Sequence, residues 1–127
     1  MIDKDSVGEM LDRLGKAVSS GDLDKVSACY AYPAFFMLQE DSTVFEKPAD
    51  FIKLFGEGRK WYVDQGIVET RPEIVRFDPM TDEIAGVDVR WPGFDKKGAE
   101  VYTETSHYLI QSAKGKPLIR VALSRTK

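Results

Sequence analysis

The sequence has little of what secreted, membrane-spanning and metal-binding proteins depend on. Its 127 residues include one cysteine, Cys29, and one histidine, His107. One cysteine cannot form an intrachain disulfide, and secreted domains of this size usually carry an even number. No apolar run approaches the roughly 18–20 residues that a helix needs to cross a bilayer. The first residues also lack the basic stretch and apolar run of a signal peptide. We therefore expect a cytoplasmic protein that does not enter a membrane.

The chain also lacks a large excess of positive or negative charge. The chain carries 18 basic and 21 acidic residues, a net charge of −3, whereas a nucleic-acid-binding protein more often presents a basic face. A zinc site would need several carboxylates beside the single histidine and cysteine, and none cluster at the spacing of metal ligands. Gly56 and Gly58 lie in a helical pattern, without the strand and lysine of a phosphate-binding loop. The sequence thus predicts no nucleic-acid partner, no metal and no cofactor.

Apolar and aromatic residues, in contrast, are plentiful. Hydrophobic residues make up 43% of the chain and charged residues 31%, which is typical of a folded globular protein. The length suits one ordinary domain spanning residues 1–127. Aromatic residues reach 11%, so they must line a large core, a cavity or an interface.

The spacing of apolar residues predicts two helices in the first part of the chain. The first covers residues 5–19, where Ser6 and Glu9 match a capping box that satisfies free amide groups at a helix start. Asp22 can cap a brief second helix, whose apolar side includes Tyr30.

A third helix is expected to follow Pro48, because the missing N–H of proline would be unpaired in a first helical turn anyway. Its apolar stripe repeats Phe51, Phe55, Gly58 and Tyr62 at helical spacing. The glycine in this stripe predicts close packing of the helix against a strand.

Period-two alternation takes over from residue 68 onward and is typical of strands. Long strands are expected over 68–78, 83–94, 99–112 and 117–125, after a short hairpin formed by 34–39 and 43–45 around a turn at 40–42. Short turns join the long strands, so consecutive strands should pair antiparallel. Pro72 interrupts the first of them and implies an edge position or a bulge. Helices gathered before an antiparallel sheet indicate an α+β fold, with the helices packed on a bent sheet.

Three stretches of the chain carry a family resemblance. They are Gly-Asp-Leu-Asp-Lys-Val after the first helix, Ala-Asp-Phe-Ile-Lys-Leu-Phe on the third helix, and a tail that contains Val-Asp-Val-Arg-Trp, Tyr-Thr-Glu-Thr-Ser-His-Tyr-Leu-Ile and Gly-Lys-Pro-Leu-Ile-Arg-Val. With this order of elements, the whole chain resembles the nuclear-transport-factor-2-like superfamily (NTF2-like, also called SnoaL-like, with a cystatin-like fold). Members often carry a tryptophan after the final turn, where this chain has Pro117-Leu118-Ile119.

The resemblance implies a cone, a cystatin-like α+β barrel whose strongly curved sheet wraps a long helix and leaves a cavity at the open end. Members of the superfamily include isomerases, dehydratases, epoxide hydrolases, polyketide cyclases and binding or oligomerisation modules, so the fold does not choose a role. Many members are homodimers that pair through the outer face of the sheet, and a homodimer of that kind is the expectation here.

The predicted turns also imply a strand register. Two-residue loops in the last two turns place Trp91 opposite Tyr102, and Glu104 opposite Arg125. The more apolar face, expected to face the helices, then holds Val87, Val89, Trp91, Tyr102, Glu104, Ser106, Tyr108, Ile110, Ile119, Val121 and Leu123. The outer face holds Asp88, Arg90, Thr103, Thr105, His107, Leu109, Arg120 and Ala122. A one-residue bulge would exchange the faces beyond it.

Glu104 is the ionisable residue of greatest interest. A carboxylate among Trp91, Tyr102 and Tyr108 would have a raised proton affinity and could act as a general base, with Tyr102 or Tyr108 as hydrogen-bond donor. The alternative is a structural ion pair between Glu104 and Arg125 near the open rim.

His107 and Asp88 are further candidates for proton transfer, because some enzymes of the superfamily pair a cavity histidine with an aspartate. On the predicted register, however, both lie on the outer face with Arg90, as solvated or dimer-interface residues.

Six aromatic residues are candidates to bind a ligand: Tyr30, Phe35, Phe55, Trp61, Tyr62 and Trp91. Buried tyrosine and tryptophan need partners for their polar atoms, which favours a cavity wall, although a plain packed core is the alternative, above all for Phe35 and Phe55. We therefore predict a domain that binds a small apolar or aromatic molecule in an aromatic-lined cavity. The alternative function is a cofactor-independent isomerase, cyclase or hydrolase that uses Glu104 as base, and a third is an oligomerisation accessory of a larger enzyme.

Overall fold

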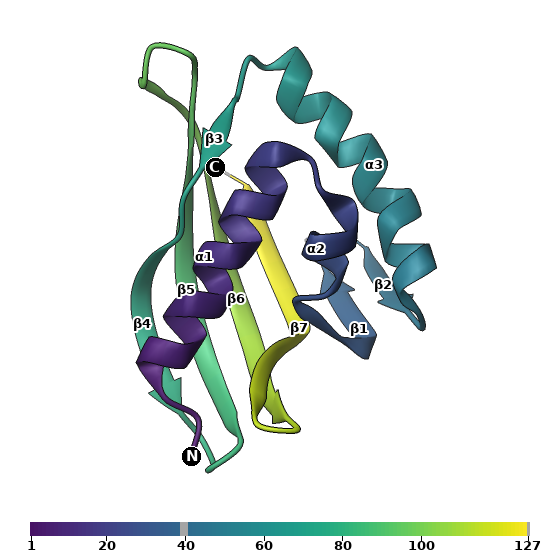
Figure 1. Ribbon diagram of the computed structural model, residues 1–127, viewed down its shortest axis with the longest axis vertical. Helices are drawn as coiled ribbons and strands as arrows, with labels where there is room; N and C mark the ends of the chain where they lie inside the picture. The colour runs from purple at the N-terminus through teal and green to yellow at the C-terminus, as the bar shows by residue number, and fades with distance from the viewer. Residues whose placement is uncertain (39–40, 127) are drawn as a thin grey trace.

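Three helices lie beside a curved sheet of seven strands in the part of the chain that the structure describes (Figure 1). The computed structural model describes residues 1–38 and 41–126, with side chains up to residue 124. In chain order the elements are α1 (Lys4–Ser20), α2 (Leu23–Ser27), β1 (Tyr30–Met37), β2 (Ser42–Phe45), α3 (Pro48–Asp64), β3 (Glu69–Thr70), β4 (Glu73–Pro79), β5 (Ile84–Phe94), β6 (Glu100–Ala113) and β7 (Lys116–Thr126). The turn expected at 40–42 lies partly outside the described residues. Within the described ranges, no helix is long and apolar enough to span a membrane.

The sheet has the strand order β2-β1-β7-β6-β5-β3, and β4 also pairs with β5. β1 and β7 run parallel, whereas the other paired strands are antiparallel. Among the described strands, those at the two ends of the sheet do not pair with each other, so the sheet curves without closing into a barrel. The break between β3 and β4 falls at Pro72, on the edge, as a residue without an amide proton requires. The predicted α+β class is confirmed.

α1 lies across the inner face of the sheet, and Gly15 sets how close it comes. A Cβ at Gly15 would lie 3.2 Å from both Pro72 Cδ and Trp91 Cζ3, which is tighter than an ordinary contact. The helix begins before the predicted capping box, because the Asp3 side chain accepts a hydrogen bond from the Ser6 backbone amide at 2.7 Å. Asp3 is therefore the N-cap, and the predicted cap at Ser6 is wrong.

Tyr30 belongs to β1 and not to the second helix, contrary to the prediction. α2 is only five residues long, and Asp22 caps it as predicted by accepting from the Lys25 amide at 3.2 Å. After α2 the chain pairs with β7, where Ile119 is the partner of Tyr30. The Ile119 amide donates to the Cys29 carbonyl at 2.9 Å. Pairing with β7 gives the backbone N–H and C=O groups of this segment the hydrogen-bond partners that a longer helix would have supplied internally.

A longer turn and a bulge together shift the pairing of β5 with β6. Trp91 is the partner of Glu104 rather than of Tyr102. One residue of this shift comes from the turn, where Asp95 faces Ala99 and its amide donates to the Ala99 carbonyl at 3.0 Å, and the other from the irregularity between Gly93 and Phe94. The shift is an even number of residues, so each side chain keeps its predicted face.

A second bulge exchanges the faces of β7 beyond Ile119. Ile110 pairs with Ile119, but the adjacent pair is Leu109 with Val121, so Arg120 is the extra residue. The residues that follow Arg120 therefore point to the opposite face from the one predicted.

Val121 and Leu123 accordingly do not belong to the inner face as predicted. Leu123 is 38% exposed, whereas Ala122, predicted to face outward, is 1% exposed and joins the core. Ser124 also turns inward, toward the helices.

α3 stands away from the sheet over most of its length (Figure 1). In this helix, all of which is described, Phe51 alone is buried. Its ring stacks on Phe55 with centroids 4.1 Å apart and lies 4.5 Å from the ring of Tyr30. One turn later, a Cβ at Gly58 would meet no described atom within 4 Å. The predicted close packing of Gly58 against a strand is thus wrong, and the space beside it belongs to a pocket.

Candidate functional site

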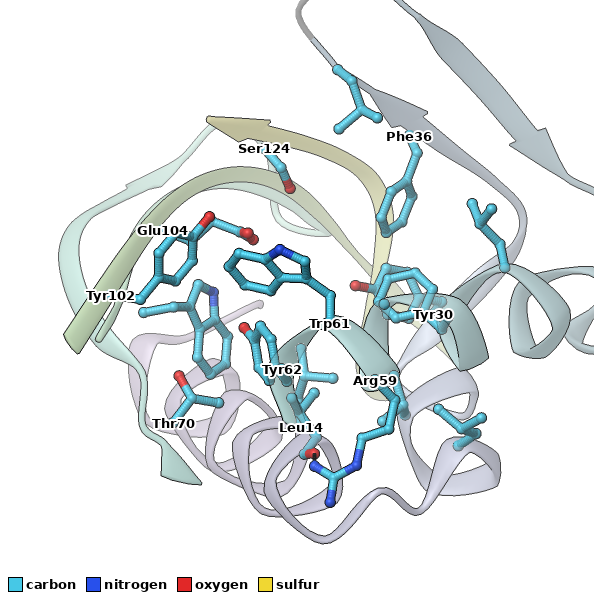
Figure 2. Close-up of a pocket in the computed structure, with 18 of the residues that line it drawn as sticks. Leu14, Tyr30, Phe36, Arg59, Trp61, Tyr62, Thr70, Tyr102, Glu104 and Ser124 are labelled. Carbon is cyan, nitrogen blue, oxygen red and sulfur yellow. Dashed lines mark hydrogen bonds between the residues drawn. The ribbon is translucent and has the colours of Figure 1, made fainter. Parts of the chain in front are cut away.

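A pocket of about 500 Å³ lies between α3, α1 and the inner face of the sheet (Figure 2). α1 and α2 supply aliphatic side chains to its wall, while α3, β1, β5 and β6 supply aromatic rings. The volume falls within the range of about 300–1,000 Å³ that is usual for small-molecule sites. The wall consists of Leu14, Val18, Leu23, Val26, Tyr30, Phe36, Leu38, Leu54, Phe55, Gly58, Arg59, Trp61, Tyr62, Thr70, Trp91, Tyr102, Glu104, Tyr108 and Ser124.

Eight of the nine predicted site residues lie in this wall: Tyr30, Phe55, Trp61, Tyr62, Trp91, Tyr102, Glu104 and Tyr108. Phe35 is the exception, because it points away from the pocket and is 40% exposed. Side chains alternate along β1, and its inner positions are Tyr30, Ala34 and Phe36. Phe36 therefore occupies the place predicted for Phe35. The even spacing of these inner residues would identify it once the strand is extended back to Tyr30.

Glu104 is the one residue with a carboxylate among the lining residues. Burial raises the pKa of its carboxyl above the ordinary value, because the charged form loses its hydration. None of the described side chains forms a hydrogen bond or an ion pair with it. The register predicted for Arg125 is wrong, since Thr126 is the backbone partner of Glu104 and Arg125 pairs with Thr105; the Arg125 side chain lies outside the described part.

Trp91 and Tyr108 form a buried, hydrogen-bonded pair in the wall. The Trp91 indole Nε1 donates to the Tyr108 hydroxyl oxygen at 2.9 Å, and both side chains are almost fully buried. Burial raises the pKa of Tyr108 to about 12, so its hydroxyl keeps its proton. The pair satisfies the indole N–H and leaves the tyrosine proton available to a further acceptor.

Trp61 and Tyr62 of α3 point their rings into the pocket, toward the sheet (Figure 2). The Trp61 ring meets Tyr102 of β6 edge to face, with centroids 4.8 Å apart, and 41% of Trp61 remains exposed. Burial, and secondly the charge of Glu104, raises the pKa of Tyr62. The carboxyl of Glu104 is therefore near enough to Tyr62 of α3 to disfavour ionisation of the Tyr62 hydroxyl.

Arg59 is a pocket residue that the sequence analysis misses. Its Nη1 donates to the carbonyl oxygens of Val18 at 3.1 Å and Ser19 at 3.2 Å in the last turn of α1, where the Val18 carbonyl also accepts from the amide of the C-cap Gly21. The guanidinium thus ties α3 to the end of α1. Figure 2 shows it on the far side of the pocket from Glu104. Sequence spacing carries no signal for this contact, because 40 and 41 residues separate the partners.

Asp88 and His107 lie on the outer face of the sheet. They are direct partners in the β5–β6 ladder, and Asp88 Oδ1 contacts His107 Nδ1. Their side chains are 39% and 48% exposed. Arg90 beside them donates to both carboxylate oxygens of Glu73 at 3.1 Å and also contacts Glu100. Neither member of the Asp88–His107 pair is part of the described pocket wall.

Metal and thiol chemistry find little support in the described residues. No group of three or more histidine, cysteine, aspartate or glutamate side chains there is arranged to hold a metal ion. Cys29 is buried, and burial raises the pKa of its thiol, which disfavours the nucleophilic thiolate.

Solved structures from several bacteria share this fold. An NTF2-like protein of unknown function from Shewanella oneidensis MR-1 is 18% identical, with 94% of this chain and 96% of that chain covered and a TM-score of 0.74. A domain of unknown function with a cystatin-like fold from Nostoc punctiforme PCC 73102 is 14% identical over 97% of this chain and 76% of that one, with a TM-score of 0.72. An NTF2-like protein from Novosphingobium aromaticivorans is 11% identical over 96% and 80%, with a TM-score of 0.72.

These identities are low, so the likeness shows the fold alone. No functionally curated protein matches the chain. The family described as NTF2-like protein (DUF6841), in contrast, matches residues 4–127, which confirms the resemblance drawn from the sequence. The chain belongs to this NTF2-like family.

Proposed function

We propose that the chain binds a small apolar or aromatic molecule in the pocket between α3 and the sheet. The observation that carries this proposal is the composition of the pocket wall, which holds eight aromatic rings around about 500 Å³. Rings offer a large apolar area on stiff side chains, and burying an apolar ligand against them contributes about 25 cal/mol per Å² removed from water. A few polar groups, above all the Glu104 carboxyl and the Tyr30 hydroxyl, would orient the ligand.

A thermal-shift screen with a library of small aromatic and aliphatic compounds tests this proposal. A compound that binds only the folded state raises the melting temperature, and a tighter compound at the same concentration raises it further. Hits should then bind Trp61→Ala more weakly by roughly tenfold or more, as expected for loss of a contact worth about 1–2 kcal/mol.

Val63→Ala is the matched control, because Val63 lies on the same helix, is 58% exposed and is not part of the described wall. It should bind the hits as the unmodified chain does. A library without hits at high concentration, or hits that bind Trp61→Ala unchanged, would contradict the proposed site.

The second candidate function is a cofactor-independent isomerase, cyclase or hydrolase with Glu104 as general base. The observation in its favour is a carboxyl in an apolar pocket with a raised pKa and no described partner, since proton transfer is most efficient when the pKa of the base approaches the working pH. Tyr108 or Tyr102 would donate a hydrogen bond to the oxygen on which charge develops.

Proton abstraction from carbon can be measured without knowing the product. Ligands from the screen that carry an acidic C–H bond should exchange it for solvent deuterium when incubated with the protein in D₂O. Glu104→Gln should abolish this exchange while the ligand still binds. Exchange at an unchanged rate in the variant would remove Glu104 as the base.

A homodimer through the outer sheet face is a separate proposal. It draws on the family resemblance and on exposed apolar side chains of that face, such as Leu123, the ladder partner of His107. Light scattering should give twice the chain mass, and Leu123→Asp should shift the protein toward the monomer. A monomer across the micromolar range would contradict it. The cytoplasmic location stays a prediction that rests on the single cysteine.

A further inference from the structure

One carboxylate in the pocket has no opposite charge beside it among the side chains that the structure describes. Glu104 and Arg59 are the two lining residues with formally charged side chains. Arg59 directs its Nη1 to the carbonyls that end α1, and Figure 2 shows its guanidinium across the pocket from Glu104. No described side chain bonds to Glu104. When Glu104 is ionised, its end of the pocket is therefore electronegative.

Aromatic rings stand around this carboxylate. Trp61 and Tyr62 reach it from α3, and Tyr102 stands beside it on β6, packed against Trp61 (Figure 2). The face of an aromatic ring carries negative charge density, so it attracts a cation, and tryptophan does so most strongly. The carboxylate and the ring faces thus act in the same direction on any charged ligand.

Three ligand classes differ in what they do for Glu104. A neutral ligand excludes water from the pocket and leaves the carboxylate unpaired, and an anion adds repulsion at short range. A cation with an apolar body supplies the missing charge while its body packs against the rings. The wall of the pocket therefore complements an organic cation both in charge and in apolar contact.

We propose that the pocket selects an organic cation, an ammonium group on an apolar or aromatic body, with Glu104 as its counter-ion and Trp61 and Tyr62 as walls of an aromatic cage. This inference rests on the proposed small-molecule binding and names the ligand class of the same site. It also gives Glu104 a role in binding that does not require catalysis.

Three probes of one shape test the charge preference. Benzyltrimethylammonium, its neutral carbon isostere 2,2-dimethylpropylbenzene and the anion phenylmethanesulfonate share a benzyl body and a tetrahedral head. Titration of the full chain near pH 7.5, followed by NMR shifts of the protein, gives the three dissociation constants. The cation should bind at least tenfold more tightly than the neutral isostere, and the anion most weakly.

Glu104→Gln keeps the shape of the side chain and removes its charge. It should weaken the cation by tenfold or more and change the neutral isostere by less than about twofold. Glu57→Gln is the matched control, because Glu57 is an exposed carboxylate on α3 outside the described wall, and it should leave all three constants unchanged. Trp61→Leu, which keeps an apolar side chain without a ring face, should also reduce the advantage of the cation.

The outcomes separate this inference from the proposed function. Equal binding of cation and neutral isostere, or an unchanged cation constant in Glu104→Gln, overturns the cation preference and leaves small-molecule binding intact. Tighter binding of the neutral or anionic probe does the same. Failure of all three probes overturns the cation preference, and failure of the compound library as well overturns the binding function itself.

Discussion

α1 and α3 have the same length, 17 residues each, but relate to the sheet in opposite ways. α1 buries six residues, and Gly15 lets its backbone approach the inner face of the sheet. α3 buries Phe51 near its start, and its later turns stay apart because Trp61 meets Tyr102 ring to ring. Small side chains at a helix face allow close packing, whereas large rings hold the backbones apart. One helix thus builds the core, and the other builds the wall of a pocket.

The largest expected effect is on the free energy of unfolding, and it differs between one leucine of each helix. Leu11 on α1 is fully buried, whereas Leu54 on α3 is 45% exposed. Leu11→Ala should lower the free energy of unfolding by about 2–5 kcal/mol, the usual cost of a cavity in a packed core. Leu54→Ala should change it by about 0.5 kcal/mol or less. Urea denaturation measures both, and equal losses would erase the contrast between the helices.

A pair of glycines tests the same contrast with opposite signs. At Gly15 a Cβ would press on rigid neighbours, namely the Pro72 and Trp91 rings at 3.2 Å and the Thr70 carbonyl oxygen at 3.3 Å. Gly15→Ala should therefore lower the free energy of unfolding by about 1 kcal/mol. Gly58→Ala, with no described atom within 4 Å of the new Cβ, should raise it by about 0.5–1 kcal/mol, because alanine favours a helix interior.

The same denaturation experiment decides between the two signs. Stabilisation by Gly15→Ala would mean that α1 can move away from the sheet without loss. Destabilisation by Gly58→Ala would mean that α3 packs more closely in solution than its geometry indicates.

The smallest effect concerns the pH dependence of stability at the pocket. Burial raises the pKa of Glu104 in the folded state, so the folded chain holds this proton to higher pH than the unfolded chain does. Its contribution to stability is complete below the unfolded pKa, about 4.3 for glutamate, and is lost as the pH rises through the folded pKa. Glu104→Gln should thus melt higher than the unmodified chain at pH 7.5 and converge with it near pH 4.

The exposed carboxyl of Glu57 on α3 provides the control for this prediction. Glu57→Gln should follow the unmodified chain across the whole pH range. A constant difference between Glu104→Gln and the unmodified chain from pH 4 to pH 7.5 would show that ionisation of Glu104 is not its source.

Much of the candidate site follows from period-two alternation along β5 and β6. Trp91, Glu104 and Tyr108 were predictable as inner residues because the longer turn after Asp95 and the bulge between Gly93 and Phe94 each shift the ladder by one residue, an even number in total. Alternation fails only where an odd number intervenes. That occurs at Arg120, and the inner residues of β7 then differ from the prediction.

Other residues depend on contacts between distant parts of the chain. Tyr30 has helical spacing with the residues before it, and only its pairing with Ile119 of β7 makes it the start of a strand. Phe35 and Phe36 are chemically identical, so the orientation of β1 decides which one enters the pocket. Arg59 meets the end of α1 through tertiary structure alone.

By itself, the sequence determined the α+β class, the order of the elements, the NTF2-like family and most of the aromatic residues that line the pocket. The class, the order and the lining residues follow from local periodicity, turn residues and composition, which act over a few residues at a time, whereas the family follows from the resemblance of three stretches of the sequence. The tertiary structure decided that α3 stands off the sheet, that two bulges reset the register, and that Glu104 faces rings without a described partner. Such features depend on side-chain volumes and on backbone partners far apart in the chain, which no local pattern contains.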